Sequence, residues 1–179
     1  MDPDLQKILL TQDQIRARVS EVAGQVDKAL SGKRPLAIGI LKGSIIFYAD
    51  FIRCLTMPLE LDFMAVSSYG SGSTSSGKLK IKKDLDTDIK GRDVIVIEDI
   101  IDSGFTLACL KKLLNERGAA SVTIVTLLDK HERRTEDISP DYNCFEIPDE
   151  FVVGYGLDYN EEYRSLPYIG ILKRSVYEK

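Results

Sequence analysis

Apolar residues recur at helical spacing over two long stretches of the chain. The first stretch lies behind Thr11 and Gln14, a pair with the spacing of a capping box, and it ends at Gly32. The second stretch ends at Gly118. The apolar positions are Ile15, Val19, Val22, Val26 and Leu30 in the first, and Leu107, Leu110, Leu113 and Leu114 in the second. The pattern predicts two amphipathic helices, and a shorter helix is expected at residues 45–55.

Short apolar runs without alternation are typical of strands that are covered on both faces. Three such runs lie at residues 35–41, 94–97 and 121–128, and two weaker strand signals lie at residues 59–66 and 78–85. Because strands and helices alternate along the chain, we predict an α/β fold with a mainly parallel sheet flanked by helices. The tail at residues 141–179 holds short apolar pieces between turns, and we expect it to add edge strands or a small hood built from terminal segments.

A Ser- and Gly-rich segment at residues 67–78 separates the two weaker strands. Its composition indicates flexibility, which suits either a linker between domains or a loop within one domain. Because strands flank it closely on both sides, we favour a flexible loop in a single domain that spans residues 1–179. Long loops in compact domains often cover a functional site, so this loop is a candidate active-site lid.

Composition and charge narrow the class of protein. The chain has 179 residues, of which 44% are hydrophobic and 29% charged, and this balance indicates a soluble globular protein. Its 24 Lys and Arg residues against 28 Asp and Glu residues give a net charge of -4, so no nucleic-acid partner is expected. The single His, His131, and the three widely spaced cysteines disfavour a zinc site and a disulfide framework, and they indicate a reducing compartment.

The N-terminal segment MDPDLQKILL carries acidic residues where a secretory signal needs positive charge. No stretch of the sequence reaches the ~20 apolar residues that a membrane helix requires. We therefore expect a cytoplasmic protein with no membrane partner.

The segment after the strand at residues 94–97 concentrates candidate chemistry. Glu98 and Asp99 follow that strand directly, and the turn at residues 102–106 leads into the next helix. Adjacent carboxylates offer oxygen ligands for Mg²⁺ or for hydroxyl groups, and a Ser/Gly/Thr turn at a helix start presents N–H groups to a phosphate. Ligands of parallel α/β sheets bind beyond the carboxyl ends of the strands, which is where this turn would lie. The alternative is that Asp102 or Ser103 simply caps the helix.

The residues from Val94 to Leu107, VIVIEDIIDSGFTL, resemble the phosphoribosyl pyrophosphate signature of the type I phosphoribosyltransferases. Within that superfamily, the chain is similar to the hypoxanthine-guanine phosphoribosyltransferases of the short bacterial type. The resemblance covers nearly the whole chain and depends on five patches. They lie at residues 41–44, 68–69, 94–107, 128–130 and 147–164.

The resemblance implies an enzyme of purine salvage. Such an enzyme transfers 5-phosphoribose from phosphoribosyl pyrophosphate to N9 of hypoxanthine or guanine, yields IMP or GMP plus pyrophosphate, and requires Mg²⁺. Relatives commonly form homodimers or homotetramers, and residues 141–179 would contribute to a hood over the base. The loop at residues 67–78 would carry two substrate contacts, Ser68 and Tyr69, and close over the site to exclude water.

The resemblance also assigns residues to the sugar and phosphate groups. Glu98 and Asp99 would hold the ribose hydroxyls directly or through Mg²⁺, and Asp158 would help to bind a second Mg²⁺. Arg164 and the Lys42-Gly43 pair would bind pyrophosphate, and the peptide bond before Lys42 is often cis in this family. The turn that cradles the 5′-phosphate would comprise Asp102, Ser103, Gly104, Phe105 and Thr106.

On the base side, Asp102 would act as general base or acid toward N7 of the purine. Lys130 would donate to the exocyclic O6, so a 6-aminopurine, which presents a donor there, would be rejected. Phe151 would stack on the ring, Val152 would contact it through backbone groups, and the backbone of Asp158 would lie near the C2 substituent. From the residues alone, Phe151 and Val152 are equally well explained as core positions.

Two rival interpretations stay open on the sequence. A regulatory protein of the same fold would sense phosphoribosyl pyrophosphate, although this acidic chain offers no basic face for nucleic acid. A related enzyme would prefer xanthine or a pyrimidine. Lys130, Phe151 and Asp158 favour a 6-oxopurine, but they leave the preference among hypoxanthine, guanine and xanthine open.

Overall fold

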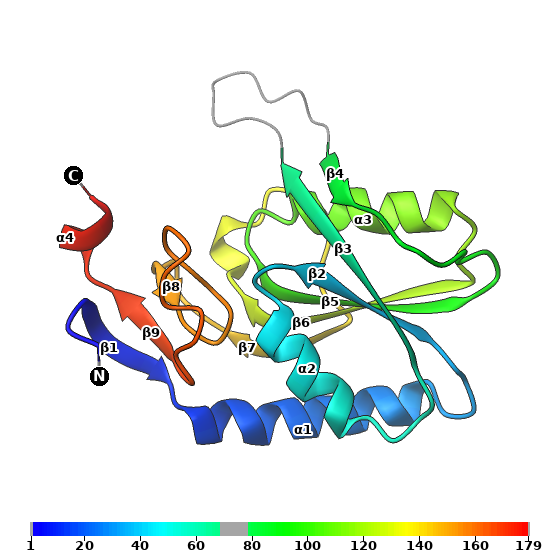
Figure 1. Ribbon diagram of the computed structural model, residues 1–179, viewed down its shortest axis with the longest axis horizontal. Helices are drawn as coiled ribbons and strands as arrows, with labels where there is room; N and C mark the ends of the chain where they lie inside the picture. Colours follow the sequence, from blue (N-terminus) through cyan, green and yellow to red (C-terminus); the bar gives the residue numbers. More distant parts are fainter. Residues whose placement is uncertain (1, 69–78, 179) are drawn as a thin grey trace.

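The computed structural model describes residues 2–68 and 79–178, and a six-stranded sheet runs through its centre (Figure 1). The strand order is β4-β3-β2-β5-β6-β7; five of these strands run parallel, and β4 joins β3 antiparallel. The strands are β2 (Leu36–Leu41), β3 (Glu60–Ser68), β4 (Leu79–Lys83), β5 (Asp93–Ile101), β6 (Ser121–Asp129) and β7 (Tyr142–Glu146). The predicted α/β class with a mainly parallel sheet is therefore confirmed.

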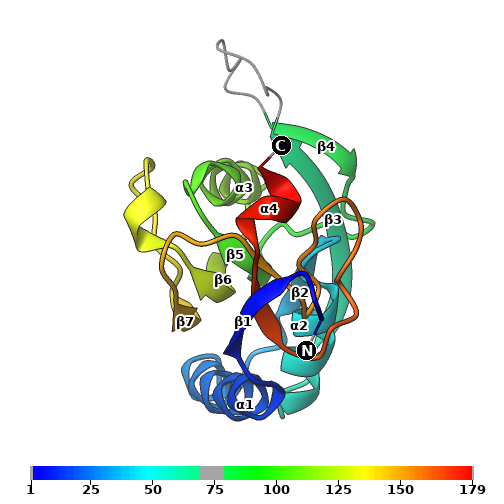
Figure 2. The ribbon, with the colours of Figure 1, turned by 90° about the vertical axis from the view of Figure 1, so that its left-hand side faces the viewer.

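Helices cover both faces of this sheet. The helices α1 (Gln12–Ala29) and α2 (Ile45–Cys54) pack on one face, and α3 (Phe105–Glu116) packs on the other (Figures 1 and 2). In β5, Ile95 and Ile97 join the cluster around α1 and α2, whereas Val94 and Val96 join the cluster around α3. Successive side chains of a strand point to opposite faces, so a strand between two helical layers needs an unbroken apolar run.

The helices begin and end close to the predicted positions. Thr11 accepts a hydrogen bond from the Gln14 N–H group, and the Gln14 side chain accepts one in return from the Thr11 N–H group, which completes the predicted capping box of α1. The helix α3 stops shortly before Gly118, whose φ of 82° is left-handed.

A second, three-stranded sheet lies at one end of the molecule, on the left in Figure 1. Its order is β1-β9-β8, formed by β1 (Leu5–Leu10), β9 (Ile169–Leu172) and β8 (Val152–Val153), and all its pairs are antiparallel. The strand β1 was not predicted. In the tail, β7 extends the edge of the central sheet, whereas β8 and β9 build the small sheet, so both expected arrangements of the tail occur. The short elements η1 (His131–Arg133) and α4 (Arg174–Tyr177) follow β6 and β9.

The predicted end of the strand at residues 94–97 is wrong. The strand β5 continues to Ile101, so Glu98 and Asp99 belong to the strand and not to the following turn. The reason is the neighbouring strand, because Ile100 pairs with Leu128 of β6 and the parallel ladder continues to the end of both strands.

The predicted loop at residues 67–78 also needs correction at its start. Ser67 and Ser68 belong to β3, where they pair with Lys80 and Leu79 of β4. The remaining residues of that predicted loop, which include Tyr69, lie outside the described residues.

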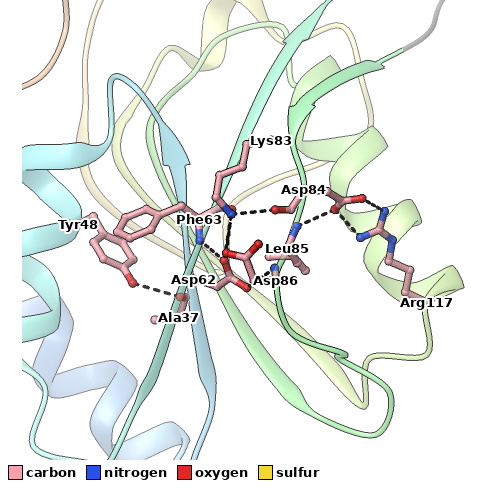
Figure 3. A network of polar contacts seen from close by, with 9 residues as sticks. All are labelled: Ala37, Tyr48, Asp62, Phe63, Lys83, Asp84, Leu85, Asp86 and Arg117. Atoms are coloured by element: carbon pink, nitrogen blue, oxygen red, sulfur yellow. Dashed lines mark hydrogen bonds and ion pairs between the residues drawn. The ribbon is translucent and has the colours of Figure 1, made fainter.

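A buried carboxylate joins β3 to the chain that follows β4 (Figure 3). Asp62 is 6% exposed and accepts hydrogen bonds from the N–H groups of Phe63 and Asp86 at 2.7 and 2.9 Å. The Lys83 ammonium lies 3.4 Å from the same carboxylate. Burial by itself raises the pKa of Asp62, but these three donors outweigh burial and leave the pKa below its ordinary value.

The structure also bears on two exclusions made from the sequence. The three cysteines, Cys54, Cys109 and Cys144, are free, as the absence of paired spacing predicts. In the part of the chain that the structure describes, no helix has the length and apolar character needed to cross a membrane.

Candidate active site

A cavity of about 410 Å³ opens at the carboxyl ends of β2 and β5. The strand order reverses there, because the chain proceeds from β2 to β3 in one direction and from β5 to β6 in the other. Open α/β sheets bind ligands at such a switch point. The predicted site residues in the cavity wall are Lys42, Gly43, Glu98, Asp99, Asp102, Ser103, Gly104, Thr106, Asp158 and Arg164. Four separate segments of the sequence therefore meet at one cavity.

The remaining predicted contacts lie elsewhere. Within the described residues, the cavity wall does not include Phe105, Lys130, Phe151 or Val152. The wall does include residues that the sequence analysis did not single out as site residues, namely Ile40, Leu41, Val66, Ser67, Ile100, Ile101 and Leu107. Apart from Ser67, these side chains are apolar and come from the ends of strands or from the first turn of α3, so they add an apolar part to the wall.

The adjacent carboxylates Glu98 and Asp99 form the floor of the cavity at the end of β5. Glu98 is 8% exposed, and burial together with the neighbouring charge of Asp99 raises its pKa well above the ordinary value. Burial also raises the pKa of Asp99, although the charge of Arg164 and the N–H group of Ile100 act in the opposite direction. The raised pKa values indicate that the surroundings stabilise the charged forms of the two carboxylates poorly, so a cation or hydroxyl donors on a ligand would stabilise them.

The turn after β2 approaches these carboxylates closely. The peptide bond between Leu41 and Lys42 is cis, as the resemblance implies for this position. A Cβ atom on Gly43 would lie 1.5 Å from Oδ2 of Asp99, and a Cβ atom on Gly156 would lie 2.0 Å from the carbonyl oxygen of Gly43. Glycine at both positions therefore lets the Lys42-Gly43 turn fit between β5 and the chain after β8.

The turn at residues 102–106 begins α3 and faces the same cavity. Gly104 precedes the helix with a left-handed φ of 88°, and Oγ of Ser103 accepts a hydrogen bond from the N–H group of Phe105 at 3.3 Å. The first N–H groups of a helix have no partner within the helix and favour an anion. Ser103, Gly104 and Thr106 line the cavity, so this end of it suits a phosphate group.

A buried arginine that the sequence analysis missed holds this turn in place. The side chain of Arg134 is 9% exposed, donates from Nε to the carbonyl oxygen of Asp102 at 3.2 Å, and forms an ion pair with Asp129 at 2.5 Å. The N–H groups of Thr135 and Glu136 both donate to the carbonyl oxygen of Ser103, at 3.0 and 3.1 Å. The chain after β6 thus fixes the backbone of the turn from outside the cavity.

Four charged side chains meet beside this turn at the end of β6. Nζ of the buried Lys130 lies 3.7 Å from Oδ1 of Asp149. Arg133 bridges two carboxylates, with Nε 3.3 Å from Oδ1 of Asp102 and one guanidinium nitrogen 3.6 Å from Asp149. Oδ1 of Asp102 is buried, and apart from this ion pair with Arg133 it accepts no hydrogen bond from the described residues, so it keeps the capacity to accept one from a ligand.

The small sheet carries the predicted aromatic contact. Phe151 precedes β8 and stacks on Tyr177 with ring centroids 4.8 Å apart, while Tyr159 meets it edge-on at 5.6 Å. Val152 and Val153 are buried in β8 and contribute to the core. Val152 is therefore a core residue, as one of the two interpretations of the sequence predicts. Phe151 instead packs with the aromatic rings of Tyr159 and Tyr177.

The turn at residues 158–164 brings the last charged groups to the cavity. Arg164 donates to the carbonyl oxygen of Gly156 at 2.7 Å and pairs with Oδ1 of Asp158 at 2.8 Å. Glu161 lies between the two predicted pyrophosphate contacts, 2.9 Å from Nζ of Lys42 and 3.1 Å from Arg164. Glu161 is not among the predicted site residues, because nothing local to residues 158–164 indicates a contact with the distant Lys42.

Comparison with known proteins agrees with this arrangement. Residues 6–160 match the model of the phosphoribosyl transferase domain. A hypoxanthine-guanine phosphoribosyltransferase of Bacillus subtilis strain 168 is 53% identical over 178 residues, covering 99% of this chain and 99% of the relative. The enzyme of the same name from Streptococcus thermophilus strain CNRZ 1066 is 50% identical over 179 residues, covering 100% of this chain and 99% of the relative.

Solved structures show the same fold. A crystal structure of a hypoxanthine phosphoribosyltransferase from Staphylococcus aureus matches with a TM-score of 0.95 and 49% identity, covering 98% of this chain and 96% of that chain. The similarity in sequence and in structure extends over nearly the full length of each chain. The chain therefore belongs to the phosphoribosyl transferase family and, within it, to the hypoxanthine-guanine phosphoribosyltransferases.

Proposed function

We propose that the chain acts in purine salvage by transferring the 5-phosphoribosyl group of phosphoribosyl pyrophosphate to N9 of hypoxanthine or guanine, which yields IMP or GMP and pyrophosphate. The observation that carries the proposal is one cavity bordered by the start of α3, by the carboxylates of β5, and by Lys42 and Arg164. The donor carries a 5′-phosphate, ribose hydroxyls and a diphosphate in the same spatial order. The relatives that match nearly the whole chain bear the name of this activity.

The 5′-phosphate would bind at the turn before α3. Ser103, Gly104 and Thr106 line that end of the cavity, and the helix start supplies N–H groups and a favourable dipole. The ribose hydroxyls would then lie over Glu98 and Asp99, whose carboxylate oxygens line the cavity and would accept hydrogen bonds from them. Phe105 follows Gly104 outside the cavity wall, so its contribution would be limited to its backbone N–H group.

The diphosphate would bind between Lys42 and Arg164. Both cations come from turns at the open side of the cavity, and Asp158 and the backbone of Gly43 line the same part of the wall. A guanidinium group matches phosphate oxygens with paired donors, and an ammonium group adds a mobile point charge.

The purine base would bind beside the cavity, between the end of β6 and the small sheet. Nζ of Lys130 would donate to O6, the ring of Phe151 would stack on the base, and the backbone of Val152 would contact its edge. Oδ1 of Asp102 is a buried acceptor without a hydrogen bond from the described residues, which suits the removal or return of a proton at N7 of the purine.

The transfer breaks the bond from ribose C1 to the diphosphate and forms a bond from C1 to N9. Positive charge develops on the ribose and negative charge on the departing diphosphate in the oxocarbenium-like transition state. Lys42 and Arg164 would offset the negative charge, and the apolar side chains of Ile100 and Leu107 in the wall would limit the access of water.

We further infer Mg²⁺ as the cofactor, and the donor set fits it. Glu98, Asp99 and Asp158 supply carboxylate oxygens at the cavity, and oxygen is the ligand that Mg²⁺ prefers. The described residues contain no cluster of three or more His, Cys, Asp or Glu side chains arranged to hold a metal. The protein would thus contribute one or two carboxylates while substrate phosphates complete the shell, which is usual for Mg²⁺. When bound, the ion neutralises negative charge on the diphosphate.

An assay of purified protein with phosphoribosyl pyrophosphate, Mg²⁺ and a panel of bases tests this function. Guanine and hypoxanthine should give GMP and IMP with release of pyrophosphate, because Lys130 would donate to the 6-oxo group of either base. Adenine should be rejected by at least about a hundredfold in kcat/KM, since its 6-amino group would leave a buried donor facing another donor.

Two other outcomes would contradict the proposal. Tight binding of phosphoribosyl pyrophosphate without turnover of any base would favour a regulatory protein that senses this metabolite. A clear preference for xanthine would keep the reaction and change the assigned substrate.

The assembly and location of the protein are also proposals. We expect a homodimer or homotetramer, as is common for the family, and sedimentation equilibrium would measure it directly. The three free cysteines support a reducing, cytoplasmic environment.

A further inference from the structure

The side chain of Glu161 lies between the two cations that are assigned to the diphosphate. Its Oε1 atom is 2.9 Å from Nζ of Lys42, and its Oε2 atom is 3.1 Å from the guanidinium group of Arg164. A single carboxylate thus engages both cations, one through each oxygen. Two phosphate oxygens of a diphosphate would need the same two donors, so Glu161 and this substrate group cannot pair fully with them at the same time.

The backbone that presents Glu161 is held in an unusual conformation. Asn160 and Glu161 have φ values of 52° and 65°, and two successive non-glycine residues in the left-handed region are costly. The N–H group of Glu161 donates to Oδ2 of Asp158 at 2.9 Å, and Tyr159 and Glu162 exchange two backbone hydrogen bonds. The turn therefore directs the carboxylate of Glu161 back over the cavity, toward the Lys42 turn.

Burial does not explain these contacts. The side chains of Lys42 and Glu161 are 68% and 63% exposed, so each is well solvated without the other. Exposed ion pairs contribute little to folding stability, because water and salt screen them. The hydrogen bond from Lys42, followed by that from Arg164, lowers the pKa of Glu161, so the carboxylate carries its full negative charge at neutral pH.

We propose that Glu161 is an internal competitor for the diphosphate: its carboxylate pairs with Lys42 and Arg164 in the empty site and must be displaced when phosphoribosyl pyrophosphate or pyrophosphate binds. The inference depends on the proposed function, because it assumes that these two cations receive the diphosphate. Glu161 therefore lowers the affinity for phosphoribosyl pyrophosphate in the forward reaction and for pyrophosphate in the reverse reaction. It also provides the cations with a partner as pyrophosphate leaves, which favours product release.

Isothermal titration of the full chain with inorganic pyrophosphate and Mg²⁺ tests this inference. The variant Glu161→Gln keeps the shape of the side chain and removes its charge, so it should bind pyrophosphate about three- to tenfold more tightly, the scale of two exposed ion pairs. Its affinity for GMP should stay unchanged, because GMP carries no diphosphate and its phosphate would bind at the turn before α3. Raising the salt concentration should reduce the difference between the variant and the wild type.

The adjacent Glu162 offers a matched control. It is an exposed glutamate on the same turn, so Glu162→Gln makes the same change of net charge without touching Lys42 or Arg164. Its affinity for pyrophosphate should equal that of the wild type. A Glu161→Asp variant, which keeps the charge but shortens the reach, should fall between the wild type and Glu161→Gln.

The outcomes separate the inference from the function on which it depends. If Glu161→Gln binds pyrophosphate no more tightly than Glu162→Gln does, Glu161 is not a competitor and the inference is wrong. The same conclusion follows if Glu161→Gln changes the affinities for GMP and pyrophosphate equally, since that would indicate a disturbed turn. If the wild type and all variants bind neither pyrophosphate nor phosphoribosyl pyrophosphate, the proposed function itself fails.

Discussion

The environment of Lys130 bears on the proposed choice of base. Its side chain is buried at the end of β6, and its ion-pair partner Asp149 lies 3.7 Å away, beyond ordinary hydrogen-bond distance. A buried ammonium group whose donors are not fully used gains from an acceptor on the ligand and loses from a donor. Selectivity for 6-oxopurines is therefore expected to depend on this one side chain.

We predict that Lys130→Ala raises KM for hypoxanthine by about ten- to a hundredfold, the scale of one lost hydrogen bond to a charged group. KM for phosphoribosyl pyrophosphate should change much less, because Lys130 does not line the cavity assigned to the donor. Steady-state kinetics with each substrate varied in turn measure both values. The control Lys112→Ala, on the exposed face of α3, should change neither. Similar losses for base and donor would show that the role given to Lys130 is wrong.

At the scale of elements, the start of α3 depends on a segment that follows it by about thirty residues in sequence. Arg134 reaches from the chain after β6 to the carbonyl oxygen of Asp102, and Ile138 would lie 2.7 Å from a Cβ atom on Gly104. Because Arg134 also pairs with Asp129, it links the end of β6 to the turn that precedes α3. Arg134 thus connects the turn that is proposed to bind the 5′-phosphate with the end of β6, where the base is proposed to bind.

Arg134→Gln should lower the free energy of unfolding by about 3 kcal/mol, because it leaves the buried carboxylate of Asp129 without its partner. Arg134→Lys keeps the charge but not the geometry of the guanidinium group, so it should cost less stability and still reduce kcat by displacing the turn. Urea unfolding and steady-state kinetics measure the two effects. Arg16→Lys, at an ion pair whose side chains are 82% and 88% exposed, is the control that should alter neither. An unfolding curve for Arg134→Gln identical to that of the wild type would show that Arg134 does not stabilise the contact between the end of β6 and the turn before α3.

Local sequence patterns locate most elements of the central sheet but not the ends of every strand. Apolar runs identify β2 and β6 to within a residue or so, because strands covered on both faces have no polar positions. The acidic pair at residues 98–99 resembles the start of a turn, yet pairing with β6 keeps it in β5. The strand β1 has a mixed polar pattern with two irregularities in its pairing with β9, and its partner lies at the other end of the chain.

In the candidate site, too, local sequence patterns identify some residues and miss those that depend on distant partners. The signature segment at residues 94–107 and the Lys42-Gly43 turn are each a short continuous stretch of sequence, so a motif can identify them. The structure brings both stretches to one cavity. Arg134 and Glu161 act through partners far away in sequence, at Asp102 and Lys42. A single sequence carries no local signal for such contacts, because an arginine or a glutamate in a polar loop is ordinarily solvated.

At the scale of the whole molecule, a polar network holds the antiparallel edge of the sheet against α3 (Figure 3). Asp62 of β3 binds the backbone of Asp86 and the ammonium group of Lys83. Arg117, at the end of α3, forms paired hydrogen bonds of 2.6 and 2.7 Å with Asp84. These contacts connect β3, the chain after β4 and α3, and they lie away from the residues of the cavity wall.

We predict that Asp62→Asn lowers the free energy of unfolding at pH 7 by about 1–3 kcal/mol, because buried donors lose a charged acceptor. The pKa of Asp62 is depressed in the folded state, so its contribution is complete above the ordinary value of 3.8 and is lost as the pH falls through the folded value. The difference in the free energy of unfolding between the wild type and Asp62→Asn should therefore become smaller below about pH 3.8. Urea unfolding over a pH series measures it, with the exposed Asp13→Asn as control. A difference that stays constant with pH would contradict this account.

The close approach of Gly43, Asp99 and Gly156 has a consequence for how the sequence can change. A Cβ atom at either glycine would collide with its neighbour, at 1.5 Å from Asp99 in one case and 2.0 Å from the Gly43 carbonyl oxygen in the other. A substitution of Gly43 would require the Asp99 side chain to move, and a substitution of Gly156, whose φ is 103°, would require the backbone at Gly43 to shift. The three positions should therefore behave as one unit in a deep mutational scan, with strongly non-additive double variants, although more than a hundred residues separate Gly43 from Gly156 along the chain.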